Sequence, residues 1–190
     1  MKFSNEEIFD IIKAWLAISI AFAILLSKNE IFSPSFFINL LVSAITVGLG
    51  FLLHELAHKK LAQKYGCFAE FRAFNIMLVV AILFSFVGFI FAAPGAVFIS
   101  GHVTTSRNGK ISLAGPLVNI ALAIIFLLLI QLDLGSFFNL VTNYGANINA
   151  WLALFNLIPI LGLDGTKVLA WNKPIYFTAV AASAILVFAF

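Results

Sequence analysis

Residues 54–58 read His-Glu-Leu-Ala-His, and their types and spacing suit metal-dependent hydrolysis. On a helix, a separation of four residues advances about 6 Å and returns to nearly the same face. His54 and His58 could therefore bind one zinc ion, with Glu55 beside the open coordination position as a general base. The alternative is a set of satisfied polar residues in helix packing. We favour a functional site, because burying two histidines and a glutamate in an apolar helix is costly.

A catalytic zinc site usually has three protein ligands, so a further ligand must come from another part of the chain. His102 is one candidate, but its polar neighbours favour a solvated loop. Asp164 is the stronger candidate, because it lies in the otherwise apolar stretch NLIPILGLDG, residues 156–165, where a proline and a glycine weaken the helix. Counting residues from the helix ends places Asp164 at a depth similar to that of the two histidines. The alternative is a helix cap or a partner for Lys167.

The elements that must position these residues are those of a membrane protein. The chain has 190 residues, of which 63% are hydrophobic and 10% are charged, whereas a soluble domain carries about 25% charged residues. We expect one membrane-embedded domain over residues 1–190, an all-α membrane bundle with about five transmembrane helices. A re-entrant or buried apolar segment and a short β-hairpin complete the expected fold. The single cysteine, Cys67, excludes a disulfide framework within the chain.

Capping residues and apolar runs predict the helices. Ser4 and Glu7 form a capping box at the start of the first helix, and Pro34, which follows a Ser N-cap, opens the second, which ends near Tyr65. The stretch 133–146 is rich in Gly, Asn and Ser and is expected to be a loop. The predicted helices cover residues 5–27, 34–65, 113–132, 147–171 with an interruption at 159–164, and 174–190.

Residues 94–112 are rich in Val, Ile and Thr and contain an Asn-Gly pair at 108–109, so a β-hairpin is predicted there. Positive charges follow the second helix and also occur in this hairpin, and the positive-inside rule places both in the cytoplasm. A single crossing by the apolar run 74–92 would put them on opposite sides of the membrane. We therefore expect this run to bend back near Ser85 or Gly88, the alternative being an ordinary spanning helix.

Three motifs resemble those of the site-2 protease family of intramembrane zinc metalloproteases. They are HELAH at 54–58, GPLVN at 115–119 and NLIPILGLDG at 156–165, in the order found in that family. The resemblance covers over half the chain, with a catalytic core at about 34–171, and is closest to the compact prokaryotic type without an added PDZ or CBS regulatory domain. Gly162 and Thr166 depart from the family pattern, which often has proline and glycine there, but neither is a ligand position.

The resemblance implies an endopeptidase that cuts within or near transmembrane segments of membrane proteins. The implied site residues are His54, His58 and Asp164 as ligands of one zinc ion per chain, Glu55 as catalytic base, and Gly115, Asn119 and Asn156 as substrate contacts. The i, i+4 spacing of the Gly and Asn of GPLVN suits close helix packing at least as well. An unwound substrate could also pair with an edge of the predicted hairpin, although a plain connecting hairpin is equally consistent.

The expected partners are a transmembrane protein substrate and the lipid bilayer. The net charge of +3 indicates membrane orientation rather than nucleic-acid binding, and the oligomeric state is left open. The expected location is the cell membrane of a prokaryote, in a multi-pass arrangement whose site opens to the cytoplasm. Two other classes compete. A non-catalytic binder of transmembrane segments would have no need of Glu55, and a transporter would show inverted repeats, which the sequence lacks.

Overall fold

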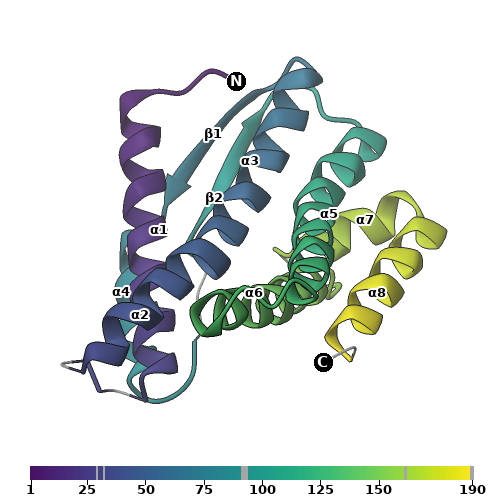
Figure 1. Cartoon of the computed structure of the whole chain (residues 1–190). Coiled ribbons are helices and arrows are strands. Elements are labelled where there is room, and N and C mark those ends of the chain that lie inside the picture. Colours follow the sequence, from purple (N-terminus) through teal and green to yellow (C-terminus); the bar gives the residue numbers. More distant parts are fainter. Residues whose placement is uncertain (29, 32, 91–93, 161, 189–190) are drawn as a thin grey trace.

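The structure is a computed structural model that describes residues 1–28, 30–31, 33–90, 94–160 and 162–188. Its elements are α1 (Asn5–Leu26), α2 (Pro34–Ser43), the π-helical turn η1 (Ala44–Gly48), α3 (Leu49–Lys64), β1 (Phe68–Ala73), α4 (Asn75–Ser85), β2 (Gly95–Ser100), α5 (Thr105–Ile130), α6 (Ser136–Asn156), α7 (Asp164–Trp171) and α8 (Lys173–Val187). The expected, mainly helical fold is confirmed. The two strands lie against α1 and α3, and α5 packs on α3, α6 and α7 (Figure 1).

Within the described residues, three helical segments are long and apolar enough to cross a membrane. They are Asn5–Leu26, Pro34–Lys64 and Thr105–Ile130. The helices α4 and α8 are apolar but shorter than a span. The expectation of a helical bundle with apolar spans is thus supported, while the expected number of about five spans is not confirmed.

The second predicted helix forms as one run, but it contains a feature that sequence reasoning missed. Between α2 and α3 the chain makes the π-helical turn η1, and the Trp15 indole N–H donates to the carbonyl of Ala44, its first residue, at 3.1 Å. A π-turn carries one residue more than the α-helix it interrupts, so it rotates every later side chain about the helix axis. The helix then ends as predicted, with Tyr65 as C-cap and Gly66 in a left-handed conformation, φ +78.

The predicted hairpin over residues 94–112 is wrong in its pairing. Gly95–Ser100 is a strand, but its antiparallel partner is Phe68–Ala73, with Phe71 opposite Val97. A strand far back in the chain therefore replaces the local partner. The sheet lies next to the end of α3, which carries the His-Glu-Leu-Ala-His sequence.

The Asn-Gly pair at 108–109 lies inside α5, which begins well before the predicted residue 113. The Thr104 side chain caps this helix by accepting a hydrogen bond from the Arg107 N–H at 3.3 Å. Gly109 is buried where a Cβ would overlap Trp171 of α7. A helix cap and close helix packing thus override the turn preference of Asn-Gly.

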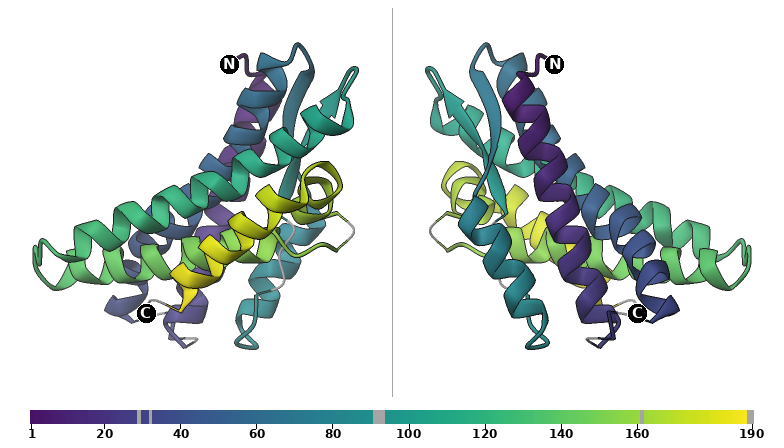
Figure 2. Two further views of the ribbon diagram at one scale, coloured as in Figure 1. Left: turned by 90° about the vertical axis from the view of Figure 1, so that its right-hand side faces the viewer. Right: turned by 90° about the vertical axis from the view of Figure 1, so that its left-hand side faces the viewer.

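The apolar run 74–92 reverses direction, as expected. The helix α4 ends at Ser85, and Gly88 has a left-handed φ of +85. Because the last residue of β1 pairs with the first residue of β2, the chain leaves the sheet and returns to the same end of it. Figure 2 shows α4 projecting beyond that end. Residues 91–92 of this run lie outside the described residues.

The stretch 133–146, predicted to be a loop, is mostly helical, because α6 begins at Ser136. Asn143 and Asn149 are accommodated in α6 by side-chain bonds to the carbonyl four residues earlier, Asn143 to Asn139 at 2.7 Å and Asn149 to Gly145 at 2.9 Å. The predicted helix 147–171 is in fact the end of α6 and all of α7, separated by the expected break. The last helix, α8, matches its prediction at Lys173–Val187, and residues 189–190 lie outside the description.

Candidate metal centre

Three side chains from distant parts of the sequence converge between α3 and α7. The Asp164 Oδ2 atom lies 3.3 Å from His54 Nε2 and 3.1 Å from His58 Nε2. One possible ligand atom from each residue lies within 4.8 Å of the others, and all three residues are buried. Two imidazole nitrogens and one carboxylate oxygen form a donor set that fits a catalytic zinc site with an open position.

The loop between α6 and α7 brings the carboxylate to the histidines. Asp164 is the first residue of α7, and Gly165 follows where a Cβ would overlap the Leu157 carbonyl. The Thr166 hydroxyl donates to the Ile160 carbonyl at 2.7 Å and so closes the loop. Thr166, which departs from the expected family pattern, thus has a structural contact of its own.

Both imidazole rings are oriented through their Nδ1 atoms. The His54 Nδ1 atom lies 2.6 Å from Asn119 Oδ1, and the His58 Nδ1 atom lies 2.8 Å from the Ile111 carbonyl oxygen. Since both partners are acceptors, each Nδ1 carries the proton and donates it. Each Nε2 therefore keeps its lone pair for a metal, which is the usual arrangement of metal-binding histidines.

Asn119 belongs to a buried polar network that joins three helices. Its side chain is 0% exposed, and its Nδ2 group donates to the Gly50 carbonyl at 3.2 Å and to Asn149 Oδ1 at 3.0 Å. The structure thus gives Asn119 contacts within the protein, as the packing alternative expects, and its substrate contact stays a prediction. Sequence reasoning missed Asn149, and the only signal was an asparagine amid apolar residues of one helix.

Replacing Asn119 with Ala is expected to weaken zinc binding by about 10–100-fold, because the Nδ1–H of His54 loses the acceptor that orients the ring. Competition for zinc against a chelator of known affinity measures this change. Asn143→Ala, an exposed asparagine on α6, is the matched control. Equal zinc affinity in the Asn119 variant and the parent would contradict an orienting role.

Gly115 lies directly against the two ligand atoms of the histidines. A Cβ at this position would be 2.5 Å from the Nε2 atom of His54 and 2.5 Å from that of His58. The close packing expected for this glycine is therefore present. Because Gly115 has no side chain, the space beside the two donor atoms stays open. A side chain of any size would enter that space.

Glu55 lies on the sheet side of α3, one residue after His54. Its Oε2 atom accepts a hydrogen bond from the Val97 N–H at 3.2 Å. The carboxylate expected to act as the base therefore lies at the edge of β2, and its catalytic role stays a prediction. Its other carboxylate oxygen is not engaged by this backbone bond.

The remaining two candidates are Asn156 and His102. Asn156 ends α6, is half-buried, and donates from Nδ2 to the Leu152 carbonyl at 2.8 Å; its substrate contact stays a prediction. His102 is exposed and, within the residues that the structure describes, is not part of the metal-binding group. The interpretation of His102 as a solvated residue is therefore supported.

Two similar proteins carry names that agree with a zinc-dependent hydrolytic site. The chain is 42% identical over 179 residues to the protein named "Putative zinc metalloprotease MJ0611" of Methanocaldococcus jannaschii, which covers 92% of this chain and 89% of that protein. The chain belongs to a family of zinc metalloproteases. This metalloprotease is also 30% identical over 148 residues to "Zinc metalloprotease MJ0392" of the same organism, covering 75% of the chain and 35% of that relative.

No protein-family model and no solved structure matches the metalloprotease. Its family and its donor set nevertheless agree on the cofactor, which is zinc. The geometry adds what a sequence likeness does not give, namely the convergence of His54, His58 and Asp164 and the contacts that orient them.

Proposed function

We propose that this zinc metalloprotease is of the site-2 type and hydrolyses peptide bonds within or near transmembrane segments of membrane proteins. The observation that carries the proposal is the position of the metal-binding histidines. Both lie on the 31-residue apolar run Pro34–Lys64, a helix with the length and composition of a membrane span. A protease whose histidines lie on such a helix is suited to substrates that lie in the bilayer.

The outer surface of this helix also suits a lipid environment. Four large apolar side chains follow one another at helical spacing along it and are exposed: Leu41, Ile45, Leu49 and Leu53. An exposed apolar stripe of this kind is unfavourable in water and favourable against lipid chains. In the proposed multi-pass arrangement in a prokaryotic cell membrane, the exposed Lys60 and Lys64 near the end of α3 face the cytoplasm, and the site opens there.

The proposed mechanism assigns a task to each residue of the site. His54, His58 and Asp164 hold the zinc ion, which when bound supplies Lewis-acid chemistry by polarising the scissile carbonyl and making water more acidic. Glu55 takes the proton of the attacking water and passes it to the amine leaving group. The hydrogen bond from the Val97 N–H to one Glu55 oxygen supports this role, because it holds the carboxylate beside β2.

Substrate capture is proposed at the edge of β2. A transmembrane helix keeps its carbonyls in its own hydrogen bonds, so it must unwind before cleavage. The unwound segment would add to β2 as a further strand, beside Glu55, by main-chain hydrogen bonds. Asn156 at the end of α6 is assigned to hold the substrate, as the family resemblance implies.

The test is cleavage in liposomes. The purified, zinc-loaded protease is reconstituted with a set of single-span proteins that share their soluble domains and differ only in the transmembrane segment. In half of the set, a Gly-Pro pair at the centre weakens the helix. We expect fragments whose new ends, identified by mass spectrometry, lie in or near the transmembrane segment, and more product from the weakened segments. Removing zinc with a chelator is expected to stop cleavage, and adding zinc back to restore it.

Cuts confined to the shared soluble domains would contradict the proposal and leave an ordinary metalloprotease. Binding of the single-span proteins without any zinc-dependent cleavage would indicate the alternative, a non-catalytic protein that binds transmembrane segments in the same groove. The named metalloprotease relatives do not favour that alternative.

A further inference from the structure

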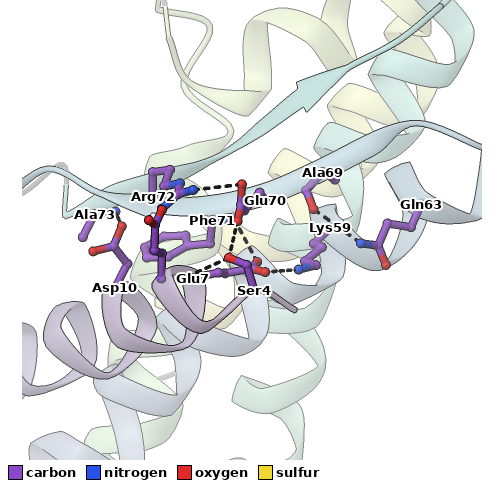
Figure 3. Close-up of polar contacts among 11 residues, drawn as sticks. Ser4, Glu7, Asp10, Lys59, Gln63, Ala69, Glu70, Phe71, Arg72 and Ala73 are labelled. Carbon is purple, nitrogen blue, oxygen red and sulfur yellow. Dashed lines mark hydrogen bonds and ion pairs between the residues drawn. The ribbon is translucent and has the colours of Figure 1, made fainter. Parts of the chain in front are cut away.

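A buried ion pair lies beside the metal centre and is separate from it. Lys59 follows His58 directly, and its side chain is 0% exposed. Its Nζ group pairs with the carboxylate of Glu7 on α1, which is 1% exposed (Figure 3). Its ammonium also lies 4.0 Å from the centroid of the Phe3 ring. Buried charges of this kind are unfavourable unless paired, so the pair requires an explanation.

Glu7 also contacts the sheet, and the expected capping box is wrong in this half. The Ser4 hydroxyl does accept from the Glu7 N–H at 3.1 Å. The Glu7 carboxylate, however, is engaged by Lys59 and by the Phe71 N–H of β1, which donates to Oε1 at 2.9 Å. The Glu7 carboxylate thus joins α1 both to α3 and to the sheet.

The contacts form a closed ring that includes Glu55. Phe71 and Val97 are opposite each other in the sheet, and their N–H groups point to opposite edges. The Phe71 N–H donates to Glu7, and the Val97 N–H donates to Glu55. Lys59 and Glu55 are separated by four residues, so they lie on one face of α3, one turn apart. The ring therefore runs from Glu55 through Val97, Phe71, Glu7 and Lys59 back to Glu55.

We infer that Glu7 and Lys59 are positioning residues for Glu55. This inference rests on the proposed role of Glu55 as the base. The bond to Val97 holds the Glu55 carboxylate to the sheet at one point only, so a small shift of α3 along the sheet would move the carboxylate with it. Lys59 lies one turn after Glu55 on α3, and its partner Glu7 accepts from the Phe71 N–H. The Glu7–Lys59 pair therefore holds α3 to the sheet at Phe71, the residue opposite Val97. With both ends held, the distance between the Glu55 carboxylate and β2 is fixed.

Neighbouring contacts keep α1 in place at the sheet. The Ser4 hydroxyl donates to Glu70, and Arg72 pairs with Glu70 at 3.1 Å (Figure 3). Arg72 also pairs with Glu6 at 2.8 Å. The hydrogen bond from Ser4 holds the pKa of the Glu70 carboxyl below its ordinary value, so this carboxyl stays ionised and paired. These contacts hold α1 to β1, whereas the Glu7–Lys59 pair connects both elements to α3.

The experiment removes both charges together, because removing one would leave the other buried and unpaired. In the variant Glu7→Gln with Lys59→Met, the amide oxygen can still accept from the Phe71 N–H, while the link to α3 is lost. The matched control makes the same chemical changes at another pair of α1, Asp10→Asn with Lys13→Met. That pair, 2.7 Å apart, bonds to the sheet through Ala73 and is partly exposed.

Two readouts are taken. Hydrogen exchange followed by mass spectrometry measures protection of the β2 amides in the zinc-loaded protein, without any substrate. Cleavage of a single-span protein in liposomes measures kcat and KM. For the Glu7–Lys59 variant we expect faster exchange in β2, full zinc content, and a kcat lowered by about 10²-fold with KM nearly unchanged, because a small displacement of a catalytic group has that effect. The control is expected to match the parent.

Unchanged exchange in β2 would overturn the inference, as would a kcat within about twofold of the parent. A fall in zinc content that accounts for the loss of activity would also overturn it, since the pair would then support the fold rather than Glu55. If the parent cleaves no transmembrane substrate, the proposed function fails, and the exchange of β2 alone decides whether the pair holds the sheet to α3.

Discussion

Glu55→Gln is expected to lower peptide cleavage by about 10²–10⁴-fold while leaving zinc bound. The amide cannot take a proton from water, but its oxygen can still accept from the Val97 N–H, so the sheet contact is preserved. The loss should therefore appear in kcat at an unchanged zinc content. Initial rates on a single-span substrate in liposomes, with zinc measured by atomic absorption, test both statements.

The matched control is Glu30→Gln, which makes the same chemical change on an exposed residue between α1 and α2. It is expected to cleave at the parent rate. If Glu55→Gln were to cleave as fast as the parent, Glu55 would not be the base. A loss of zinc in the same variant would instead point to a structural role, because the carboxylate is not one of the three converging ligands.

Gly115→Ala is expected to abolish zinc binding, and with it all cleavage. The new methyl group would lie 2.5 Å from both histidine Nε2 atoms, which is far inside a van der Waals contact. Either the rings turn away or α5 moves off α3, and both outcomes separate the donors. Zinc content after purification is the direct measurement, and thermal unfolding shows whether the helices still pack.

Ser106→Thr serves as the control, because it adds one methyl group to an exposed position of the same helix. It should bind zinc as the parent does. A Gly115→Ala variant with a full complement of zinc would show that the donors converge elsewhere than beside Gly115. A variant that unfolds at a much lower temperature, yet regains zinc when folded, would contradict steric exclusion from the site.

The metal-binding residues could be predicted because their signals are local. The i, i+4 spacing of two histidines on a helix already brings both rings to one face, and Asp164 stands out as a charged residue in an apolar stretch. The contacts that orient the two histidine rings could not be predicted. The bond from His54 to Asn119 depends on how closely α3 and α5 approach, and no local pattern reports a distance between helices.

The prediction of the fold was right where helix ends are marked by capping residues. It was wrong where turn-forming residues lie inside helices. Asn108 and Gly109 favour a turn in isolation, yet they fall within a helix that Thr104 caps earlier in the chain. Asn143 and Asn149 favour a loop, yet both bond to the backbone of their own helix. Tertiary packing decides both cases, and local preference is too weak to oppose it.

Glu7 shows the same limit in electrostatics. A serine followed three residues later by glutamate predicts a reciprocal cap, and half of that cap forms. The carboxylate instead meets a lysine far along the chain, because an unpaired buried ammonium would be much more unfavourable than an unpaired helix N–H at the protein surface. The one indication in the sequence was Lys59 itself, because a charged residue next to the histidines in an apolar helix needs a partner of opposite charge.

The π-helical turn before α3 makes the direction of the two imidazoles depend on residue count rather than on residue type. Each residue of an α-helix adds about 100° of rotation, and the turn 44–48 accommodates one residue more than an α-helical turn would. If the same residues formed a continuous α-helix, His54 and His58 would be rotated about the helix axis by roughly 100° and turned away from Asp164. Deleting one residue from 44–48 removes the extra residue and keeps the histidines in phase, whereas deleting one residue from 49–53 rotates them by that angle. The turn, whose first carbonyl accepts from the Trp15 indole, therefore sets the side of the helix on which the histidines lie.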